Sequence, residues 1–253
     1  MKPASRKPAG GQLKSQRPRA KGQGVPGRAA LYGLVAAGGR GKRFGAAKQF
    51  ARLCGKPLLL YSLEAFENCP GLSGCVVVVP ARQVKAVEAL VRRAGLRRVL
   101  AVVPGGDERT DSVRSGLALL PDDGFVAIHD AARPMLTPAM LKAGFADVRR
   151  RGPVTLGRPV TDTLKRAKAG TIEDTVDRAG LISVQTPQFF PLPLIKRAHA
   201  SAAAGRFAAT DDCALVERLG ITVGWLEGPA DNLKVTTRAD LKLAARMLCA
   251  ARS

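Results

Sequence analysis

Apolar runs alternate with amphipathic stretches along most of the chain, beginning near residue 30. Short apolar runs rich in β-formers predict strands at residues 32–37, 75–79, 98–103, 125–129 and 153–158. Helices are predicted between and after these runs, at residues 57–68, 83–94, 111–120 and 237–251. This alternation is typical of an α/β fold, and we expect a mostly parallel, doubly wound sheet with helices on both faces.

The ends of the predicted elements indicate where a ligand would bind. Pro57 suits the first turn of a helix, and Thr110 is a candidate cap for the helix that follows it. Ligands of doubly wound sheets bind beyond the carboxyl ends of the strands. We therefore expect the functional residues in the loops that follow the strands.

Residues 161–184 interrupt the alternation of strands and helices. Two short β-rich pieces, residues 162–167 and 172–177, flank the turn-prone segment 168–170. We expect a β-arm that projects from the sheet. Because an exposed two-stranded hairpin is marginally stable alone, the arm predicts packing on a second subunit and hence a homodimer.

The composition fits one globular unit. A length of 253 residues with 46% hydrophobic residues supports one large core, and we assign residues 30–253 to one domain. No apolar run approaches the roughly 18 residues needed to cross a bilayer, so we expect a cytoplasmic protein without a membrane partner. The five cysteines contain no C-x-x-C pair and are expected to be reduced core thiols.

Much of the net charge of +21 lies at the N-terminus. Residues 1–29 combine many Lys and Arg residues with Gly, Pro, Ser and Gln, and they include no acidic residue. Such a segment predicts a disordered basic tail that contacts nucleic acid at most weakly. One Trp and two Tyr leave the chain without the aromatic platform of a single-strand binder. A basic RNA-binding protein is therefore an alternative that rests on charge alone.

A glycine-rich loop with fixed positive charges follows the first predicted strand. Small residues let backbone N–H groups approach phosphate oxygens, and cations supply the countercharge. The small residues are Ala36, Ala37, Gly38 and Gly39, and the cations are Arg40, Lys42, Arg43 and Lys48. The P-loop pattern fails because Arg43 follows Lys42, and the dinucleotide fingerprint fails at Phe44. The loop predicts a polyphosphate site of another kind.

Two further segments lie at the ends of predicted strands. Residues 104–112 join a strand to a helix and offer backbone amides and polar side chains to a ribose or base. Asp130 ends a strand, and a carboxylate in that position commonly organises Mg²⁺ on phosphates. Alternatively, Asp130 forms a local ion pair with Arg133 that has no catalytic role. His129 is assigned no function.

The C-terminal half adds polar residues of the same kinds. Asp231 and Lys234 suit a metal and a phosphate respectively, although a surface turn explains them equally well. Thr186 and Thr210 offer hydroxyl groups to phosphate oxygens. Thr210 is also a candidate helix cap, because Asp211 and Asp212 follow it as in a first helical turn.

Taken together, these motifs resemble one family, 2-C-methyl-D-erythritol 4-phosphate cytidylyltransferase. The resemblance covers roughly residues 31–248, and its motifs keep the family's order. The matching segments are residues 36–43, 48–49, 105–109, 129–134, 176–178, 186–190 and 231–236. The resemblance implies a Rossmann-like nucleotidyltransferase fold and a reaction of the non-mevalonate isoprenoid pathway. In this reaction, methylerythritol phosphate attacks the α-phosphorus of CTP, which gives 4-diphosphocytidyl-2-C-methyl-D-erythritol and pyrophosphate.

The resemblance also implies roles for single residues. Arg43 and Lys48 resemble the family's transition-state cations, and Arg178 and Lys234 those that position the methylerythritol phosphate. Asp130 and Asp231 resemble the carboxylates that organise Mg²⁺, for which another divalent cation can substitute. The implied nucleotide contacts are Ala36, Ala37, Gly38, Gly39, Gly105, Gly106, Asp107, Ser112, Asp130 and Ala131. The implied contacts to the second substrate are Arg133, Thr163, Arg178, Thr186, Thr210 and Lys234.

Elementary phosphate chemistry agrees with this set of residues. A phosphate monoester is largely a dianion at pH 7, so the nucleophile needs no general base. The reaction instead needs countercharge for two polyanions, which Arg, Lys and Mg²⁺ supply. Because Thr163 and Arg178 lie on or beside the predicted arm, the arm of one subunit is expected to complete the site of its neighbour.

Two enzyme alternatives stay open at this point. A ribitol 5-phosphate cytidylyltransferase has similar loops and acts on a different polyol, although the segment 129–133 favours the methylerythritol enzyme. A sugar-phosphate nucleotidyltransferase that uses UTP or another nucleotide is the more distant alternative.

Overall fold

The computed structural model describes residues 29–38, 48–207 and 209–250. Almost all of the basic tail assigned to residues 1–29 lies outside these ranges, as do Gly39, Arg40, Lys42 and Arg43 of the glycine-rich loop. The expectations for these residues stay predictions. Among the described residues, no helix combines the length and apolar character that a membrane crossing requires.

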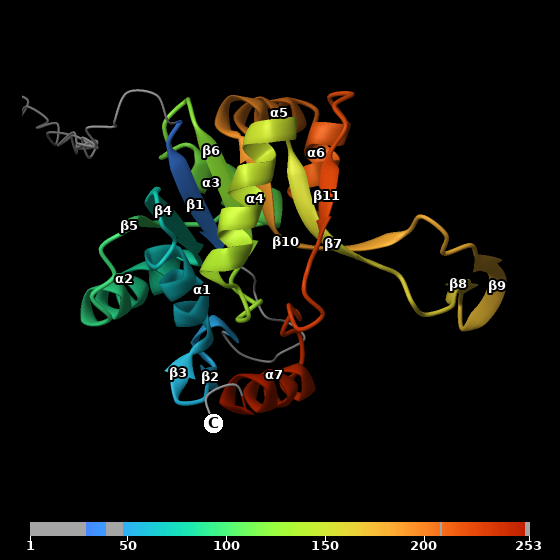
Figure 1. The fold of residues 1–253 in the computed structure, drawn as a ribbon, viewed down its shortest axis with the longest axis horizontal. Helices are drawn as coiled ribbons and strands as arrows, with labels where there is room; N and C mark the ends of the chain where they lie inside the picture. The colour runs from blue at the N-terminus through green and yellow to red at the C-terminus, as the bar shows by residue number, and fades with distance from the viewer. Residues whose placement is uncertain (1–28, 39–47, 208, 251–253) are drawn as a thin grey trace, which may run out of the picture.

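A seven-stranded sheet forms the centre of the molecule (Figure 1). Its strand order is β11-β7-β10-β6-β1-β4-β5. The strands are β1 (Leu31–Ala36), β4 (Leu72–Val79), β5 (Val99–Pro104), β6 (Phe125–Asp130), β7 (Val154–Pro159), β10 (Ile182–Pro191) and β11 (Gly224–Glu227). Pairing is parallel from β6 through β1 and β4 to β5 and between β7 and β11, whereas β10 runs antiparallel to β6 and β7. The predicted mostly parallel α/β sheet is confirmed, with β10 as an antiparallel strand that the pattern did not predict.

Helices cover both faces of this sheet. The helices are α1 (Leu58–Glu67), α2 (Val84–Arg93), α3 (Arg109–Leu117), α4 (Pro138–Arg151), α5 (Leu192–Ala204), α6 (Asp212–Glu217) and α7 (Arg238–Ala250), with short 3₁₀ turns η1 (Lys48–Phe50) and η2 (Ala81–Gln83). One buried cluster contains side chains of α1, α2 and α4, and a second contains those of α3, α5 and α6. The predicted doubly wound arrangement is therefore present.

Strand β4 shows how the apolar pattern produces these two layers. Val76 and Val78 belong to one buried cluster, and Val77 and Val79 belong to the other. Successive side chains of a strand point to opposite faces, so an unbroken valine run serves both layers. A central parallel strand needs this composition because helices cover both of its faces.

Two predicted helix caps are wrong. Helix α3 begins at Arg109 with Glu108 at its N-cap, so Thr110 lies inside the helix. Helix α6 is capped by Asp211, whose carboxylate accepts from the Ala214 N–H at 3.0 Å, and not by Thr210. The negative charge of this carboxylate also interacts favourably with the positive N-terminal end of the helix dipole.

The predicted β-arm is present as an antiparallel pair, β8 (Leu164–Lys168) and β9 (Thr171–Val176). The turn between them places Ala169 at φ 48° and Gly170 at φ 84°. The arm extends away from the seven-stranded sheet (Figure 1). Its side chains are almost all exposed, and Ile172 is 62% exposed. The arm is thus confirmed as a projecting hairpin, and its packing on a second subunit stays a prediction.

The expectation for the cysteines is wrong at two of the five positions. Cys54 and Cys249 form a disulfide. Their Cα atoms lie 6.6 Å apart, and 195 positions separate them in the sequence. No local motif signals such a pair, because helix α7 approaches the small β2 (Arg52–Leu53) and β3 (Lys56–Pro57) hairpin only in the folded chain. Cys69, Cys75 and Cys213 are buried free thiols as expected, and burial raises the pKa of Cys75 to about 12.

Candidate active site

A cavity of about 170 Å³ lies beyond the carboxyl ends of β1 and β6. Its lining contains most of the residues expected to bind the nucleotide, namely Ala36, Ala37, Gly38, Gly106, Asp107, Ser112, Asp130 and Ala131. Gly39 lies outside the described residues, and Gly105 adjoins the lining without belonging to it. Three segments that are distant in sequence therefore meet at one cavity, as expected for the carboxyl ends of strands in a doubly wound sheet.

Two glycines allow these segments to approach each other. A Cβ atom on Gly38 would lie 2.9 Å from Ser112 Oγ, and one on Gly105 would lie 2.5 Å from the same atom. Both distances are shorter than real Cβ atoms show, so a side chain at either position would have to displace the Ser112 hydroxyl. Ser112 of α3 thus packs closely against the segments that follow β1 and β5.

A second cavity of about 440 Å³ adjoins the first. It contains four of the residues expected to contact the second substrate, Arg133, Thr186, Thr210 and Lys234. Its lining also contains residues for which no function was expected from the sequence, including Arg109, Gln185, Gln188, Asp211 and Glu217. The antiparallel strand β10 supplies several members of this wall, which explains why the strand pattern alone did not find them.

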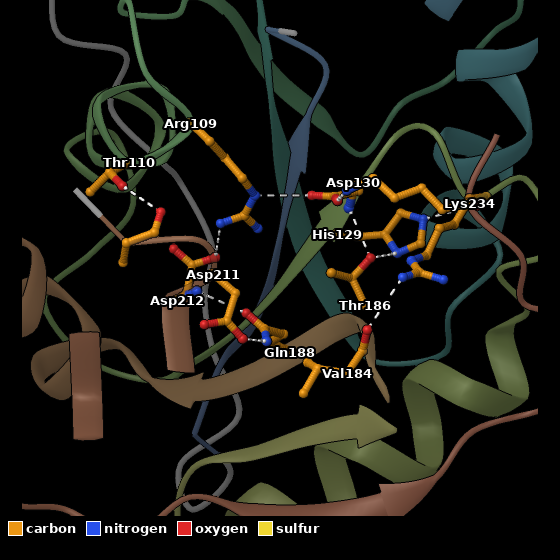
Figure 2. A network of polar contacts seen from close by, with 12 residues as sticks. Arg109, Thr110, His129, Asp130, Val184, Thr186, Gln188, Asp211, Asp212 and Lys234 are labelled. Atoms are coloured by element: carbon orange, nitrogen blue, oxygen red, sulfur yellow. Dashed lines mark hydrogen bonds and ion pairs between the residues drawn. The ribbon is translucent and has the colours of Figure 1, made fainter. Parts of the chain in front are cut away.

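Among the described residues, three charged side chains line both cavities: Arg109, Asp130 and Lys234. Arg109 Nε donates to Asp130 Oδ1 at 3.1 Å, and Lys234 Nζ donates to Asp130 Oδ2 at 2.7 Å (Figure 2). Burial opposes ionisation of Asp130, but the two cations outweigh it and hold the pKa of this carboxyl well below its usual range. Asp130 is therefore a charged group at neutral pH, shared between the cavities.

The alternative of a local Asp130–Arg133 ion pair does not describe this site. The Arg133 guanidinium instead donates to the Asn232 carbonyl at 2.6 Å and to the Val184 carbonyl at 3.5 Å. Arg133 is thereby fixed by backbone oxygens at the edge of the second cavity, while the carboxylate of Asp130 stays with its two other cations.

A second carboxylate, that of Asp212, contacts Arg109 through another nitrogen of its guanidinium. Arg109 Nη1 lies 2.8 Å from Asp212 Oδ2, and His199 Nε2 donates to Asp212 Oδ1 at 3.0 Å. Burial would raise the pKa of Asp212, but Arg109 and the His199 hydrogen bond lower it further than burial raises it. Figure 2 shows Arg109 lying between Asp130 on one side and Asp212 on the other. The sequence offered one signal for this network, the adjacent acidic residues at the start of α6.

His129 has a structural role that matches its lack of an assigned function. The ring is fully buried, its Nε2 donates to the Arg133 carbonyl at 3.1 Å, and its Nδ1 lies 3.3 Å from Thr186 Oγ1. Burial lowers the pKa of His129 to about 4, so the ring is neutral at physiological pH. The Thr186 hydroxyl also accepts from the Asp130 N–H at 3.1 Å. His129 thus holds the loop after β6 in place.

Several predicted site residues lie elsewhere. Thr163 and Arg178 belong to the exposed arm region, where Arg178 donates to the Thr161 carbonyl. Asp231 is exposed and lines neither cavity. Lys48 begins η1, and its neighbour Gln49 is buried in the wall of the first cavity. The side chains of Arg43 and Lys48 lie outside the part of the chain that the structure describes.

Comparison with known proteins identifies the family. Residues 31–250 match the model of the 2-C-methyl-D-erythritol 4-phosphate cytidylyltransferase family. The chain belongs to this family. As a cytidylyltransferase of this kind, it transfers a cytidylyl group from CTP to 2-C-methyl-D-erythritol 4-phosphate in isoprenoid synthesis.

Individual relatives match most of this chain. The 2-C-methyl-D-erythritol 4-phosphate cytidylyltransferase of Pelotomaculum thermopropionicum is 42% identical over 220 residues, which cover 85% of this chain and 92% of the relative. A crystal structure of a 4-diphosphocytidyl-2C-methyl-D-erythritol synthase superimposes with a TM-score of 0.74 at 32% identity and covers 87% of this chain and 99% of its own. The cytidylyltransferase of Thermus thermophilus gives a TM-score of 0.71 at 28% identity, with coverage of 85% and 98%.

The described donor groups of this cytidylyltransferase fit a metal ion together with a substrate. Among the described residues, no group of three or more His, Cys, Asp or Glu side chains could hold a metal by itself. Asp130 is ionised and lines both cavities, so it offers one carboxylate. Mg²⁺ characteristically combines one or two carboxylates with substrate phosphates and waters. The site is thus compatible with a cation that arrives with a triphosphate.

Proposed function

We propose that the two cavities divide the substrates of the cytidylyl transfer. The smaller cavity takes CTP, and the larger takes the 2-C-methyl-D-erythritol 4-phosphate. The observation that carries this assignment is the shared wall of Arg109, Asp130 and Lys234, because the two reacting phosphates must meet where the two cavities adjoin. This division also agrees with the separate sets of nucleotide and second-substrate residues implied by the family resemblance.

The residues of the chain then neutralise charge and position the substrates, and they do not transfer protons. The attacking phosphate is a dianion at neutral pH and needs no base, which is consistent with the neutral, buried state of His129. Lys234 and Arg133 supply positive charge to the second cavity. We assign Arg43 and Lys48 to the charge that accumulates around the α-phosphoryl group in the transition state.

A divalent cation, Mg²⁺ by our proposal, would be held by Asp130 together with oxygens of the nucleotide. When bound, it would neutralise part of the triphosphate charge and orient the phosphates. Asp130 suits this role because it stays charged at neutral pH, and Arg109 fixes its orientation through Oδ1. We retain Asp231 as a candidate second carboxylate, although it is exposed outside both linings.

We further propose a homodimer in which the arm completes the site. Thr163 and Arg178 flank the β8–β9 arm, which extends away from the sheet (Figure 1), and neither residue lines a cavity of its own chain. Ile172, a large apolar residue, is 62% exposed there, which favours a covered surface in the assembly. In the dimer, the partner's Arg178 would contribute its charge to the second cavity.

Mixed dimers test both the arm and the division of the site. Lys234→Ala and Arg178→Ala are each expected to lose most of their turnover. When the two variants are unfolded and refolded together, random pairing forms hybrid dimers with one intact site, which restores about a quarter of wild-type turnover per subunit. As a control, each variant is refolded alone and stays inactive. Absence of any recovery in verified hybrid dimers would contradict a site shared between subunits.

A further inference from the structure

Lys234 has two competing partners if it acts as proposed. In this structure its ammonium group is bound to Asp130 Oδ2 at 2.7 Å. The Lys234 side chain is 43% exposed, whereas the Asp130 side chain is only 11% exposed. Lys234 is thus free to move toward a phosphate in the second cavity, but its departure removes one of the cations that neutralise Asp130. A carboxylate this buried is costly to leave without a cation.

Arg109 is held in place by contacts that do not depend on Lys234. Its guanidinium spans two carboxylates, with Nε on Asp130 and Nη1 on Asp212. Asp212 is 1% exposed and is itself held by His199. A planar guanidinium fixed at two points cannot follow a mobile phosphate in the way a lysine can.

One nitrogen of the Arg109 guanidinium, Nη2, can donate further hydrogen bonds. Among the described residues, the buried Nη2 group has no hydrogen-bond partner. Nη2 lies on the same edge of the guanidinium as Nε, and this edge makes the two-point contact typical of arginine and carboxylate. When Lys234 releases Asp130 Oδ2, Nη2 can therefore replace it and complete a bidentate pair. Each carboxylate oxygen has two lone pairs, so Asp130 keeps an acceptor site for the divalent cation proposed above.

We propose that Arg109 is a positioning residue for the cytidylyl transfer, which holds the charge of Asp130 while Lys234 exchanges this carboxylate for the phosphate of the second substrate. The inference rests on the proposed role of Lys234. Arg109 acts through Asp130 and Lys234 and need not touch the reacting atoms. Without Arg109, Lys234 would stay paired with Asp130 and would be lost to the substrate.

The test compares the effect of Lys234→Ala in two backgrounds, wild type and Arg109→Gln. In wild type, Lys234→Ala should raise the KM for methylerythritol phosphate and lower kcat/KM by at least about tenfold. Arg109→Gln alone should give a similar loss, with a smaller change in the KM for CTP. In the Arg109→Gln background, Lys234→Ala should cause almost no further loss, because Lys234 no longer contributes.

Arg114→Gln is the matched control. Arg114 lies on the same helix and pairs with Asp111 at 2.8 Å, and it lines neither cavity. It should leave kcat and both KM values unchanged and leave the tenfold effect of Lys234→Ala intact. Arg109→Lys should recover part of the activity lost in Arg109→Gln, because its ammonium can neutralise Asp130 without spanning both carboxylates.

Thermal melting shows whether Arg109→Gln folds. If it does not, the pair Arg109→Gln with Asp212→Asn replaces it, because this pair also removes the second buried charge. Equal fold-losses from Lys234→Ala in both backgrounds would overturn the role of Arg109 while leaving the proposed function intact. A Lys234→Ala variant with wild-type kinetics would instead overturn the proposed role of Lys234 and the inference that rests on it.

Discussion

Lys234 Nζ lies 2.7 Å from Asp130 Oδ2, although 104 positions separate the two residues in the chain. Asp130 ends β6, and Lys234 follows β11 at the far side of the sheet order. Their contact joins the wall of the first cavity to that of the second. The chemistry proposed for this cytidylyltransferase therefore depends on the charge of Asp130.

Asp130→Asn is expected to lower kcat/KM by about 10²-fold or more, because a carboxamide cannot neutralise Arg109 and Lys234 or hold a cation. Steady-state pyrophosphate release measures this loss, and circular dichroism confirms the fold. Asp122→Asn is the control, since Asp122 is 99% exposed and pairs with Lys196 away from both cavities. An Asp130→Asn enzyme with nearly wild-type kcat/KM would show that this carboxylate has no part in the reaction.

Gly105→Ala is expected to raise the KM for CTP several-fold, because its Cβ would lie 2.5 Å from Ser112 Oγ and would displace the nucleotide segment. Ser112→Gly removes the atoms that clash, so Gly105→Ala should raise the KM for CTP less in a Ser112→Gly background than in wild type. Gly205→Ala serves as the control, since its Cβ would meet nothing closer than 3.5 Å. If Gly105→Ala bound CTP as tightly as wild type, close packing at Ser112 would not shape the nucleotide cavity.

The sequence predicted the parallel part of this fold well because each parallel strand is a continuous apolar run. Strand β4 is the clearest case, with Val76 to Val79 buried on alternate faces. Strand β10 was missed because the exposed residues Ser183 and Val184 lie near its start and the buried polar residues Gln185 and Gln188 follow them. These polar residues belong to the wall of the second cavity and not to a core, so hydrophobicity could not reveal the strand.

The site was predicted as separate motifs rather than as a network. Asp130 and Lys234 were considered in separate motifs, and the pairing first considered for Asp130 was Arg133, its near neighbour in sequence. The structure brings Arg109 to Asp130 instead, and Asp212 to Arg109. Such pairings arise from tertiary packing, which no local spacing encodes. The same reason applies to the Cys54–Cys249 disulfide.

The stability of the enzyme should depend on pH through His129. Burial lowers the pKa of His129 from 6.5 to about 4 in the folded chain. As the pH falls below 6.5, the unfolded chain binds this proton first, so the free energy of unfolding falls by up to about 1.4 kcal/mol per pH unit and levels off below pH 4. Urea denaturation at pH 7 and pH 4.5 measures the effect. His129→Gln should show a smaller pH dependence, and an unchanged dependence would contradict this origin.

The disulfide predicts a specific pattern of thiol labelling. When the oxidised protein is denatured without reductant, an alkylating reagent should label three of the five cysteines, Cys69, Cys75 and Cys213. After reduction, the reagent should label all five cysteines. Reduction should also lower the free energy of unfolding by about 2–4 kcal/mol. A Cys54→Ala, Cys249→Ala double variant should show no response to reductant. Labelling of all five thiols before reduction would contradict the disulfide.

Pyrophosphate release under a matrix of substrates tests the central claim most directly. Each of the four ribonucleoside triphosphates is offered with Mg²⁺ and either 2-C-methyl-D-erythritol 4-phosphate or ribitol 5-phosphate. We predict turnover with CTP and methylerythritol phosphate and at most weak turnover in every other combination. Turnover with ribitol phosphate alone, or with another nucleotide in preference to CTP, would contradict the account.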